Sequence, residues 1–420
     1  MPLSRARTLP IVIFTVALIF RSLTAAFLLH DYGSALFYHD SELSYIAAHL
    51  AAGEGYSAPY EHVPILPTAQ QPPLYPFLLA GIFRIFGSFT SQSLCVLLAI
   101  QSLAGATTAL MICVAGSRYF TRSIGLFAAC FWAFWPFESL FDLPIGIYGL
   151  SALAVSLWFV NAPHVLAISN RSRDWILLGI AGGIILLLNP TLAVVLLASV
   201  AWVRRREHIG LNLFFASTAL LLVLAPWTVR NYIAFHRFVP MRDNLGSQLF
   251  VGNHPGMTGE DDFDGFPSHD PREYSQLGEM KYMDLKQSEA LEFIRHDPTS
   301  FVRRAAKRFV DFWVSPGFIP MGIVSILAWV CIGIALLNRV GRQMGIFLAV
   351  SLFFFPTIYY VSRFWTVYRH PIEPVMLLAA FSTIQTVSGV LSKRPNSSDS
   401  IPHINRAFRP VLIDQAKSFL

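Results

Sequence analysis

Long apolar runs separated by short polar segments dominate the sequence. About 20 helical residues cross the ~30 Å hydrocarbon core of a bilayer, and the backbone inside lipid must satisfy its own hydrogen bonds. The period-two alternation of a membrane barrel is absent from the sequence. The pattern therefore predicts an all-α polytopic membrane protein with about 10 to 12 transmembrane helices. The apolar runs occupy residues 9–29, 74–89, 92–116, 123–139, 143–160, 175–203, 211–229, 316–337, 344–362 and 371–391.

One apolar run is interrupted near its middle. Residues 175–203 contain Asn189 followed by Pro190. Proline removes one hydrogen bond of a helix, and its ring clashes with the preceding turn. The segment therefore predicts either one kinked helix or two short helices, and the sequence leaves both open.

Basic residues beside the apolar runs predict the orientation of the chain. Arg5 and Arg7 precede the first run, and positive residues favour the cytoplasmic side. The N-terminus is therefore expected inside, which makes residues 30–72 the first outer loop. Residues 230–311 hold 13 of the 25 acidic residues, which favours a small outer domain. The expected division is a membrane module of residues 1–229 that includes loop 30–72, an outer domain of residues 230–315, membrane helices in residues 316–391 and a cytoplasmic tail of residues 392–420.

Composition agrees with a membrane protein and excludes several other classes. The chain is 54% apolar and 13% charged, whereas soluble domains carry about 25% charged residues. The net charge of +6 does not indicate a nucleic-acid partner, because the basic residues stand beside apolar runs as orientation signals do. The four cysteines all lie inside apolar runs, so neither a disulfide framework nor a zinc site is predicted.

The first outer loop carries the strongest candidate for chemistry. His39, Asp40 and Glu42 precede or begin a predicted amphipathic helix that ends at Gly53. A carboxylate there can act as a general base toward an acceptor, or bind a cation that neutralises a phosphate leaving group. The alternative interpretation is that Asp40 only caps the helix and that Glu42 is a solvated charge.

A second candidate cluster stands at the predicted outer end of the last apolar run. It contains Arg363, Tyr368, Arg369 and His370. Arginine suits phosphate oxygens, and ionisable residues at membrane depth are functional candidates. The alternative is that these residues anchor a helix end at the interface. Arg230, after another run, has a similar alternative as a snorkelling side chain beside aromatic residues.

Several segments, taken in order, resemble the GT-C superfamily of glycosyltransferases. They read ELSYIAAHLAAGEGYSAPY, PTAQQPPLYPFLLAGIFRIFG, LLNP, APWTVRNYIAFHRFVP, LGSQLFVGNHPG and YRHPIEPVMLLAA. The nearest branch is family 39 with its bacterial relatives, which includes protein O-mannosyltransferases and the lipid A aminoarabinose transferase. The resemblance covers most of residues 1–390. It implies a GT-C-like helix bundle in the bacterial inner membrane, with an active site that faces the periplasm.

The resemblance also implies an activity and its residues. A sugar would pass from a polyprenyl-phosphate donor to an extracytoplasmic acceptor, which can be a lipid, a glycan or a protein. The usual acidic pair of the family is Asp-Glu or Asp-Ser, and this chain has Asp40-Ser41-Glu42, so the choice of catalytic base between Asp40 and Glu42 stays open. A divalent metal would be held by Asp40, Glu42 and His39. Arg369 and His370 would contact the lipid phosphate, and the further candidates for substrate binding are Tyr368, Arg363, Gln71, Tyr75 and Arg230.

Two other functions remain as alternatives, a membrane transporter or lipid flippase and a catalytically inactive scaffold. A broken helix such as the one expected at Asn189 is typical of transporters. The acid-bearing outer loop and the outer Arg-His cluster favour an enzyme. The sequence has neither a Walker A motif nor a GxGxxG segment that opens a βαβ unit, so a lipid-borne sugar is expected in place of a nucleotide sugar.

Overall fold

The computed structural model describes residues 3–39, 41–143, 145–204, 208–257, 266–314, 319–339 and 341–391. Within these ranges the regular elements are helices, apart from one antiparallel bridge between Ser57 and Pro67. The prediction of an all-α protein is therefore confirmed. The expected tail, residues 392–420, lies outside the described residues.

The α-helices are α1 (Leu3–Asp31), α2 (Leu36–His39), α3 (Ser41–Ala52), α4 (Leu74–Phe86), α5 (Ser91–Tyr119), α6 (Arg122–Phe134), α7 (Pro136–Asp142), α8 (Tyr148–Ala167), α9 (Ser172–Leu188), α10 (Ala193–Ala198), α11 (Ile209–Phe235), α12 (Leu245–Gly252), α13 (Pro271–Leu277), α14 (Glu279–His296), α15 (Pro298–Val314), α16 (Ile319–Leu337), α17 (Arg342–Phe354), α18 (Thr357–Val361) and α19 (Glu373–Leu391). The 3-10 segments are η1 (Gly33–Ala35), η2 (Pro190–Leu192), η3 (Ser199–Trp202) and η4 (Thr366–Ile372).

Helices long and apolar enough to cross a membrane form the body of the molecule. Among the described residues there are 6 of them, at Leu9–Asp31, Ser91–Tyr119, Tyr148–Ala167, Ile209–Phe235, Ile319–Leu337 and Arg342–Val361. Shorter apolar helices cover Leu74–Phe86, Arg122–Phe134 and Pro190–Trp202. The multi-pass architecture is thus confirmed. The estimate of about 10 to 12 spans exceeds the number of long helices because several apolar runs fold as short or broken ones.

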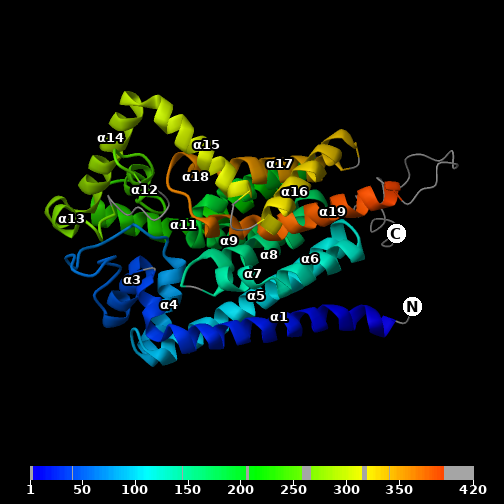
Figure 1. Ribbon diagram of the computed structural model, residues 1–420, viewed down its shortest axis with the longest axis horizontal. Helices are drawn as coiled ribbons and strands as arrows, with labels where there is room; N and C mark the ends of the chain where they lie inside the picture. The colour runs from blue at the N-terminus through cyan, green and yellow to red at the C-terminus, as the bar shows by residue number, and fades with distance from the viewer. Residues whose placement is uncertain are drawn as a thin grey trace.

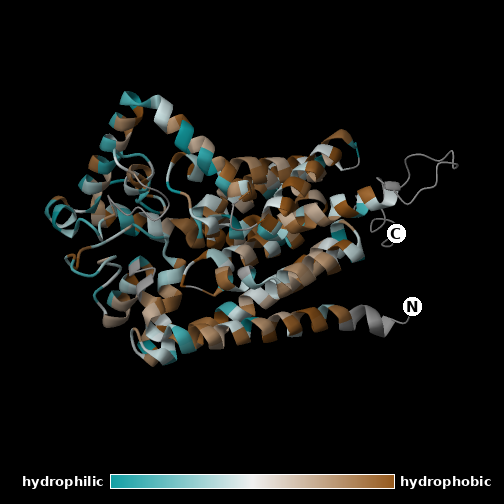
Figure 2. Cartoon of the chain, in the orientation of Figure 1, coloured by the Kyte–Doolittle hydropathy of each residue, from teal (hydrophilic) through white to brown (hydrophobic). Residues whose placement is uncertain are grey.

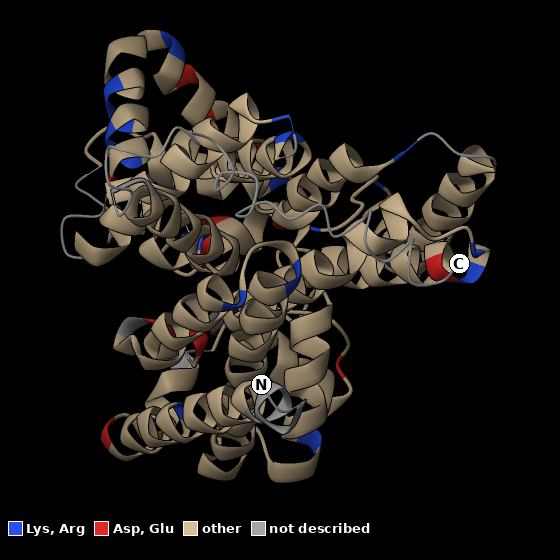
Figure 3. Cartoon of the chain, turned by 90° about the vertical axis from the view of Figure 1, so that its right-hand side faces the viewer, with Lys and Arg blue, Asp and Glu red and all other residues tan. Residues whose placement is uncertain are grey.

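The two ends of the molecule differ in character. The start of α1 and the end of α19 lie together at one end, whereas α3 and the helices α12 to α14 lie at the other (Figure 1). Hydrophobic residues concentrate along the long helices, and hydrophilic ones gather around α12 to α14 (Figure 2). Most of the ribbon is uncharged when viewed from the end where α1 begins (Figure 3). The first loop and the helices of residues 245–296 therefore share one end.

Close packing at glycines fixes the neighbouring membrane helices. A Cβ atom added to Gly116 of α5 would lie 2.2 Å from the Cα of Gly125 in α6. A Cβ added to Gly179 of α9 would lie 2.1 Å from the carbonyl oxygen of Ala216 in α11. Small residues let helix backbones approach closely in membranes, where burial of apolar surface gives little drive for association.

The interrupted run folds as two pieces, which settles the alternative that the sequence left open. Helix α9 ends at Leu188, and η2, α10 and η3 follow. The side chain of Asn189 accepts a hydrogen bond from the backbone N–H of Thr191 at 3.2 Å and donates one to the hydroxyl of Ser151, also at 3.2 Å. The Asn189 side chain thus satisfies a backbone N–H at the break, and irregular backbone at membrane depth is tolerated where it lines a cavity or is buried in protein.

The described part of the acidic region is mainly helical, with irregular segments between its helices. Asp297 caps α15 by accepting a hydrogen bond from the backbone N–H of Ser300 at 2.9 Å. The carboxyl end of α12 packs on the end of α18, since Asn253 donates to the carbonyl oxygen of Val361 at 2.7 Å. Arg308 of α15 bridges the two helices, because it donates to the carbonyl oxygens of Gly252 and Tyr360. This packing joins the acidic region to the long apolar helices.

Candidate active site

A cavity of about 450 Å³ lies between the first loop, the break after α9, helix α12 and residues 354–368. Its apolar lining includes residues of segments 193–194 and 354–358. A cavity with both ionic and apolar walls suits an amphiphilic ligand. The polar side chains that line it belong to Glu42, Tyr60, Gln71, Tyr148, Asn189, Thr191, Arg242, Asn244, Gln248, Ser268, Thr357, Tyr359, Ser362, Arg363 and Tyr368.

Glu42 supplies the carboxylate of this cavity. It lies in the first turn of α3, with 9% of its surface exposed. The hydroxyl of Tyr60 donates to its Oε1 at 2.5 Å, and the side-chain amide of Gln71 donates to its Oε2. Burial raises the pKa of the Tyr60 hydroxyl well above its usual value, and the charge of Glu42 adds to this, so Tyr60 stays a donor. Both carboxylate oxygens of Glu42 are thus held by hydrogen-bond donors.

The loop that carries Gln71 is folded back on itself. Ser57 and Pro67 face each other in the antiparallel bridge, and the backbone N–H of Ala58 donates to the carbonyl oxygen of Leu66 at 3.1 Å. The backbone between residues 56 and 71 therefore forms a closed loop, which we call the hairpin loop.

Arg230 of α11 anchors the hairpin loop from the membrane side. Its guanidinium donates to the carbonyl oxygens of Tyr56 at 2.5 Å and Thr68 at 2.7 Å. It also lies 5.3 Å from the ring centroid of Tyr56 and 5.1 Å from that of Trp227, distances typical of cation–π contacts. Arg230 therefore hydrogen-bonds the hairpin loop and is not among the residues that line the cavity.

Glu279 of α14 anchors the same loop from the outer region. Its carboxylate accepts hydrogen bonds from the hydroxyl of Thr68, from the backbone N–H of Ala69 at 2.6 Å and from the hydroxyl of Tyr274 at 2.9 Å. Burial raises the pKa of Glu279 to about 7, although these three donors oppose the shift. This anchor is therefore sensitive to pH near neutrality.

Two guanidinium groups line the cavity that contains Glu42. Arg242 donates from its Nε to the side-chain oxygen of Asn244 at 2.8 Å. Arg363 is held beside aromatic rings, 4.6 Å from the centroid of Trp365 and 5.1 Å from that of Phe266. Guanidinium groups match phosphate geometry. A single cavity thus combines one carboxylate with two cations.

Residues 70–229 match the family model described as dolichyl-phosphate-mannose-protein mannosyltransferase. The match covers 160 of the 420 residues and supports the GT-C resemblance. It indicates a membrane glycosyltransferase of the GT-C type. No curated protein and no solved structure matched the chain. Glu42 precedes the matched segment, whereas Gln71 and the Asn189 break lie inside it.

The glycosyltransferase sites expected from the sequence divide into three groups. Glu42, Gln71, Arg363 and Tyr368 line one cavity. Asp40 and the side chain of His39 lie outside the described residues, so the expected first-loop metal site is described only at Glu42. The remaining expected residues, which do not line the cavity, are Arg230, Tyr75, Arg369 and His370.

Tyr75 and the Arg369–His370 pair have internal partners. The hydroxyl of Tyr75 accepts hydrogen bonds from the backbone N–H of Gly146 at 3.0 Å and from the side-chain amide of Gln101 at 3.3 Å. Arg369 donates to the carbonyl oxygen of Phe312 at 2.6 Å, and it is 1% exposed. His370 is fully buried among carboxylates. These contacts hold elements of the helix bundle together.

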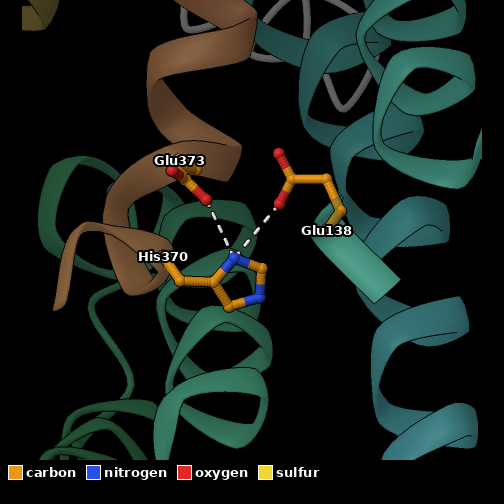
Figure 4. Close-up of side chains that lie close together, drawn as sticks. All are labelled: Glu138, His370 and Glu373. Carbon is orange, nitrogen blue, oxygen red and sulfur yellow. Dashed lines mark hydrogen bonds and ion pairs between the residues drawn. The ribbon is translucent and has the colours of Figure 1, made fainter. Parts of the chain in front are cut away.

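Among the described residues, one group of side chains could share a cation. Ligand-type atoms of Glu138, His370 and Glu373 lie within 4.8 Å of one another, and all three residues are buried. Their side chains converge from α7, η4 and α19 (Figure 4). This cluster is separate from the residues that line the cavity.

Sequence reasoning missed Tyr60 and Arg242. Tyr60 stands in an irregular segment, 18 positions after the acid that it contacts, so no helical or strand spacing relates the two. Arg242 follows a membrane helix and resembles any basic residue near an interface. Only the folding of the chain brings both to the same cavity as Glu42.

Proposed function

We propose that this protein transfers a sugar from a polyprenyl-phosphate donor to an extracytoplasmic acceptor in a cell-envelope membrane, with its active site on the outer face of a bacterial inner membrane. The observation that carries the proposal is the single cavity lined by Glu42, Arg242 and Arg363. The family match indicates the enzyme class, and the apolar walls of the cavity suit the lipid part of such a donor.

The reaction needs a base on one side of the anomeric carbon and positive charge at the leaving group. The acceptor hydroxyl or amine attacks the anomeric carbon and transfers its proton to Glu42, while the bond between that carbon and the phosphate oxygen breaks. The electron pair leaves with the polyprenyl phosphate. Arg242 and Arg363 stabilise the negative charge that develops on the phosphate, a role in which fixed cations contribute strongly.

The remaining candidates take supporting roles in this proposal. Tyr60 and Gln71 orient the carboxylate of Glu42 through one hydrogen bond each. Tyr368 forms part of the cavity wall and stacks near Tyr359, with 4.7 Å between ring centroids. Asp40 stays an alternative base, and a divalent metal bound with Glu42 stays a proposal that metal addition to the assay tests.

A transporter or flippase is the second candidate, because the broken helix at Asn189 lines the cavity. The buried carboxylate with two donors favours the enzyme, since transport of a lipid does not need a positioned base. The experiment below separates the two functions, because a transporter does not cleave the bond between sugar and phosphate.

The test is sugar release by purified protein in detergent from a panel of radiolabelled polyprenyl-phosphate sugars, with and without divalent metal. We expect turnover by the native protein and a loss of about 10²- to 10⁴-fold in Glu42→Gln, the range for removal of a general base. Glu61→Gln is the matched control, because Glu61 is an exposed acid of the same loop and bonds to Tyr45. Asp40→Asn, measured in parallel, decides between the two acids.

Replacement of Arg363 by Gln should lower kcat by about 10²-fold, the scale expected for one group that stabilises developing charge. Folded protein without turnover on any donor would reject the enzyme. Full activity in both Glu42→Gln and Arg363→Gln would keep the enzyme and reject this cavity as its active site.

A further inference from the structure

Six ionisable side chains form a buried network that the proposed reaction does not use. Each is at most 1% exposed. Charged residues at membrane depth are rare and are retained for a purpose, because their transfer from water is costly. The network consists of Arg21, Glu138, Asp142, Arg369, His370 and Glu373.

Two of the three carboxylates already have an arginine partner. Arg21 of α1 donates from Nε to Oδ2 of Asp142 at 2.6 Å. Arg369 donates from Nε to Oε1 of Glu373 at 2.8 Å. Each of these pairs has no net charge. The negative charge of Glu138 therefore has only His370 as a counter-charge within the network.

Carboxylate oxygens face both ring nitrogens of His370. Its Nδ1 lies 2.8 Å from Oε2 of Glu373 and 3.1 Å from Oε2 of Glu138 (Figure 4). Its Nε2 lies 2.9 Å from Oδ1 of Asp142. An ionised carboxylate only accepts hydrogen bonds, whereas a neutral imidazole has one donor and one acceptor nitrogen. A neutral ring would therefore direct one lone pair at a carboxylate. A doubly protonated ring donates on both sides.

The net charge of the network also favours a second proton on the ring of His370. Two arginines and three carboxylates sum to −1. One proton on the imidazole makes the network neutral, whereas a divalent metal ion bound to a neutral imidazole would make it +1. An unbalanced buried charge costs several kcal/mol, so the balance favours the proton.

Trp132 supports a positive ring at this position. Its ring stacks on that of His370, with 4.8 Å between centroids and 18° between planes. The guanidinium of Arg21 lies 5.7 Å from the centroid of the same ring. The face of tryptophan attracts cations. Two of the positive groups of the network thus share one aromatic partner.

We infer that the cluster of Glu138, His370 and Glu373 is a binding site for one proton and not for a metal ion, and that His370 is a permanent imidazolium. This cation closes a neutral network that ties α1, α7, η4 and α19 together. The same η4 segment carries Tyr368 into the wall of the cavity. The inference does not rest on the proposed reaction.

The test compares thermal unfolding of His370→Gln, Glu138→Gln and the double variant in the full-length protein in detergent. Each single variant leaves one unbalanced buried charge and should lower Tm, whereas the double variant restores neutrality and should lose clearly less than the sum of the two. A double variant that loses the full sum would overturn the inference. Gln385, which bonds to Thr121 at 2.7 Å away from the network, offers a neutral control in Gln385→Ala.

Two measurements on the native protein keep the inference testable if the variants do not fold. In ¹⁵N-histidine NMR, one ring should keep the doubly protonated signature up to pH 8, and we assign that ring to His370. Metal analysis after purification should find no divalent metal beyond the one equivalent that a site at Glu42 could hold. Loss of the doubly protonated signal at pH 8, or a stoichiometric metal that Glu138→Gln releases, would overturn the inference.

Discussion

At the residue scale, the proposed base is defined by its two hydrogen-bond donors. Tyr60 and Gln71 hold one oxygen each of Glu42. A carboxylate fixed in this way keeps one orientation toward an acceptor, which lowers the entropic cost of reaching the reactive geometry. The hydrogen bond to Tyr60 is one between a neutral donor and a charged acceptor, the stronger class of such bonds.

Tyr60→Phe tests this positioning. Removal of the hydroxyl leaves the packing of the ring and deletes a hydrogen bond worth about 1.5–3 kcal/mol to a charged group. We expect kcat to fall by about 10- to 100-fold with little change in the KM for the donor. Tyr45→Phe is the control, because it also deletes a bond to a glutamate of the loop, at Glu61. Equal losses in the two variants would argue against a specific role for Tyr60.

The sequence predicted the chemistry of single residues only in part. Glu42 could be predicted from its place at the start of an amphipathic helix. Arg369 and His370 could be predicted as ionisable residues at membrane depth, and the pairing of Arg369 with Glu373 spans only four positions. The contacts of His370 with Glu138 and Asp142 could not be predicted, since both carboxylates lie more than 200 positions away in the chain. Pairing across such separations follows from the packed bundle and leaves no local pattern.

At the scale of elements, glycine positions set the distances between membrane helices. Gly116 and Gly125 lie where α5 meets α6, and the first has no room for a side chain. Gly333 of α16, by contrast, has no other atom within 4 Å of an added Cβ. Gly116 and Gly333 thus differ in packing, although both lie in long apolar helices of the membrane-spanning type.

Gly116→Ala should lower Tm, whereas Gly333→Ala should leave it unchanged or raise it slightly. The added methyl group at position 116 meets backbone atoms, which cannot move aside, and overpacking costs about 1–3 kcal/mol. At position 333 the change only removes the flexibility of glycine, worth about 0.5–1 kcal/mol in a helix. Thermal unfolding of both variants in one detergent measures the difference. A tolerated Gly116→Ala would contradict the close contact of α5 and α6.

Element boundaries were largely predictable where local chemistry decides them. The cap at Asp297 and the end of the first-loop helix at Gly53, whose φ is +84°, could be predicted from residue type alone. The break at Asn189 could be located but not resolved into two pieces. That outcome depends on Ser151 of α8, which hydrogen-bonds the Asn189 side chain and comes from another part of the chain.

At the scale of the whole molecule, the acidic region and the first loop meet through Glu279 of α14, which contacts Thr68 and Ala69. Burial raises the pKa of this carboxyl to about 7 in the folded protein, whereas the ordinary value for a glutamic acid is 4.5. Because the folded pKa is the higher one, the stabilisation is complete below about pH 4.5 and is lost as the pH rises through 7. Contact between α14 and the hairpin loop should therefore weaken on alkalinisation.

Hydrogen exchange at the backbone amides of residues 68–69 measures this opening. Between pH 5 and pH 8 the contact should lose about 2–3 kcal/mol, since one pKa unit corresponds to 1.36 kcal/mol. After correction for intrinsic exchange rates, protection should fall with rising pH in the native protein and stay flat in Glu279→Gln. Glu292→Gln, on the exposed face of α14, should behave like the native protein. A flat profile in the native protein would exclude Glu279 as the titrating group.

The overall class followed from the sequence because lipid allows few backbone structures. Long apolar runs could only be helices, and basic residues gave an orientation that sets the first loop and residues 230–315 on one side. The meeting of those two regions at Thr68, Ala69 and Glu279 could not be predicted, because it depends on side chains more than 200 positions apart.

Two side chains from different helices hold the hairpin loop. Arg230 of α11 donates to the carbonyl oxygen of Thr68, and Glu279 of α14 accepts from the backbone N–H of Ala69. Gln71, which steadies Glu42, is the end of that loop. A nanobody that binds α14 and separates it from the hairpin loop would therefore loosen the hydrogen bond between Gln71 and Glu42 without entering the cavity. The surface of α14 is thus a target for inhibition at a distance from the cavity.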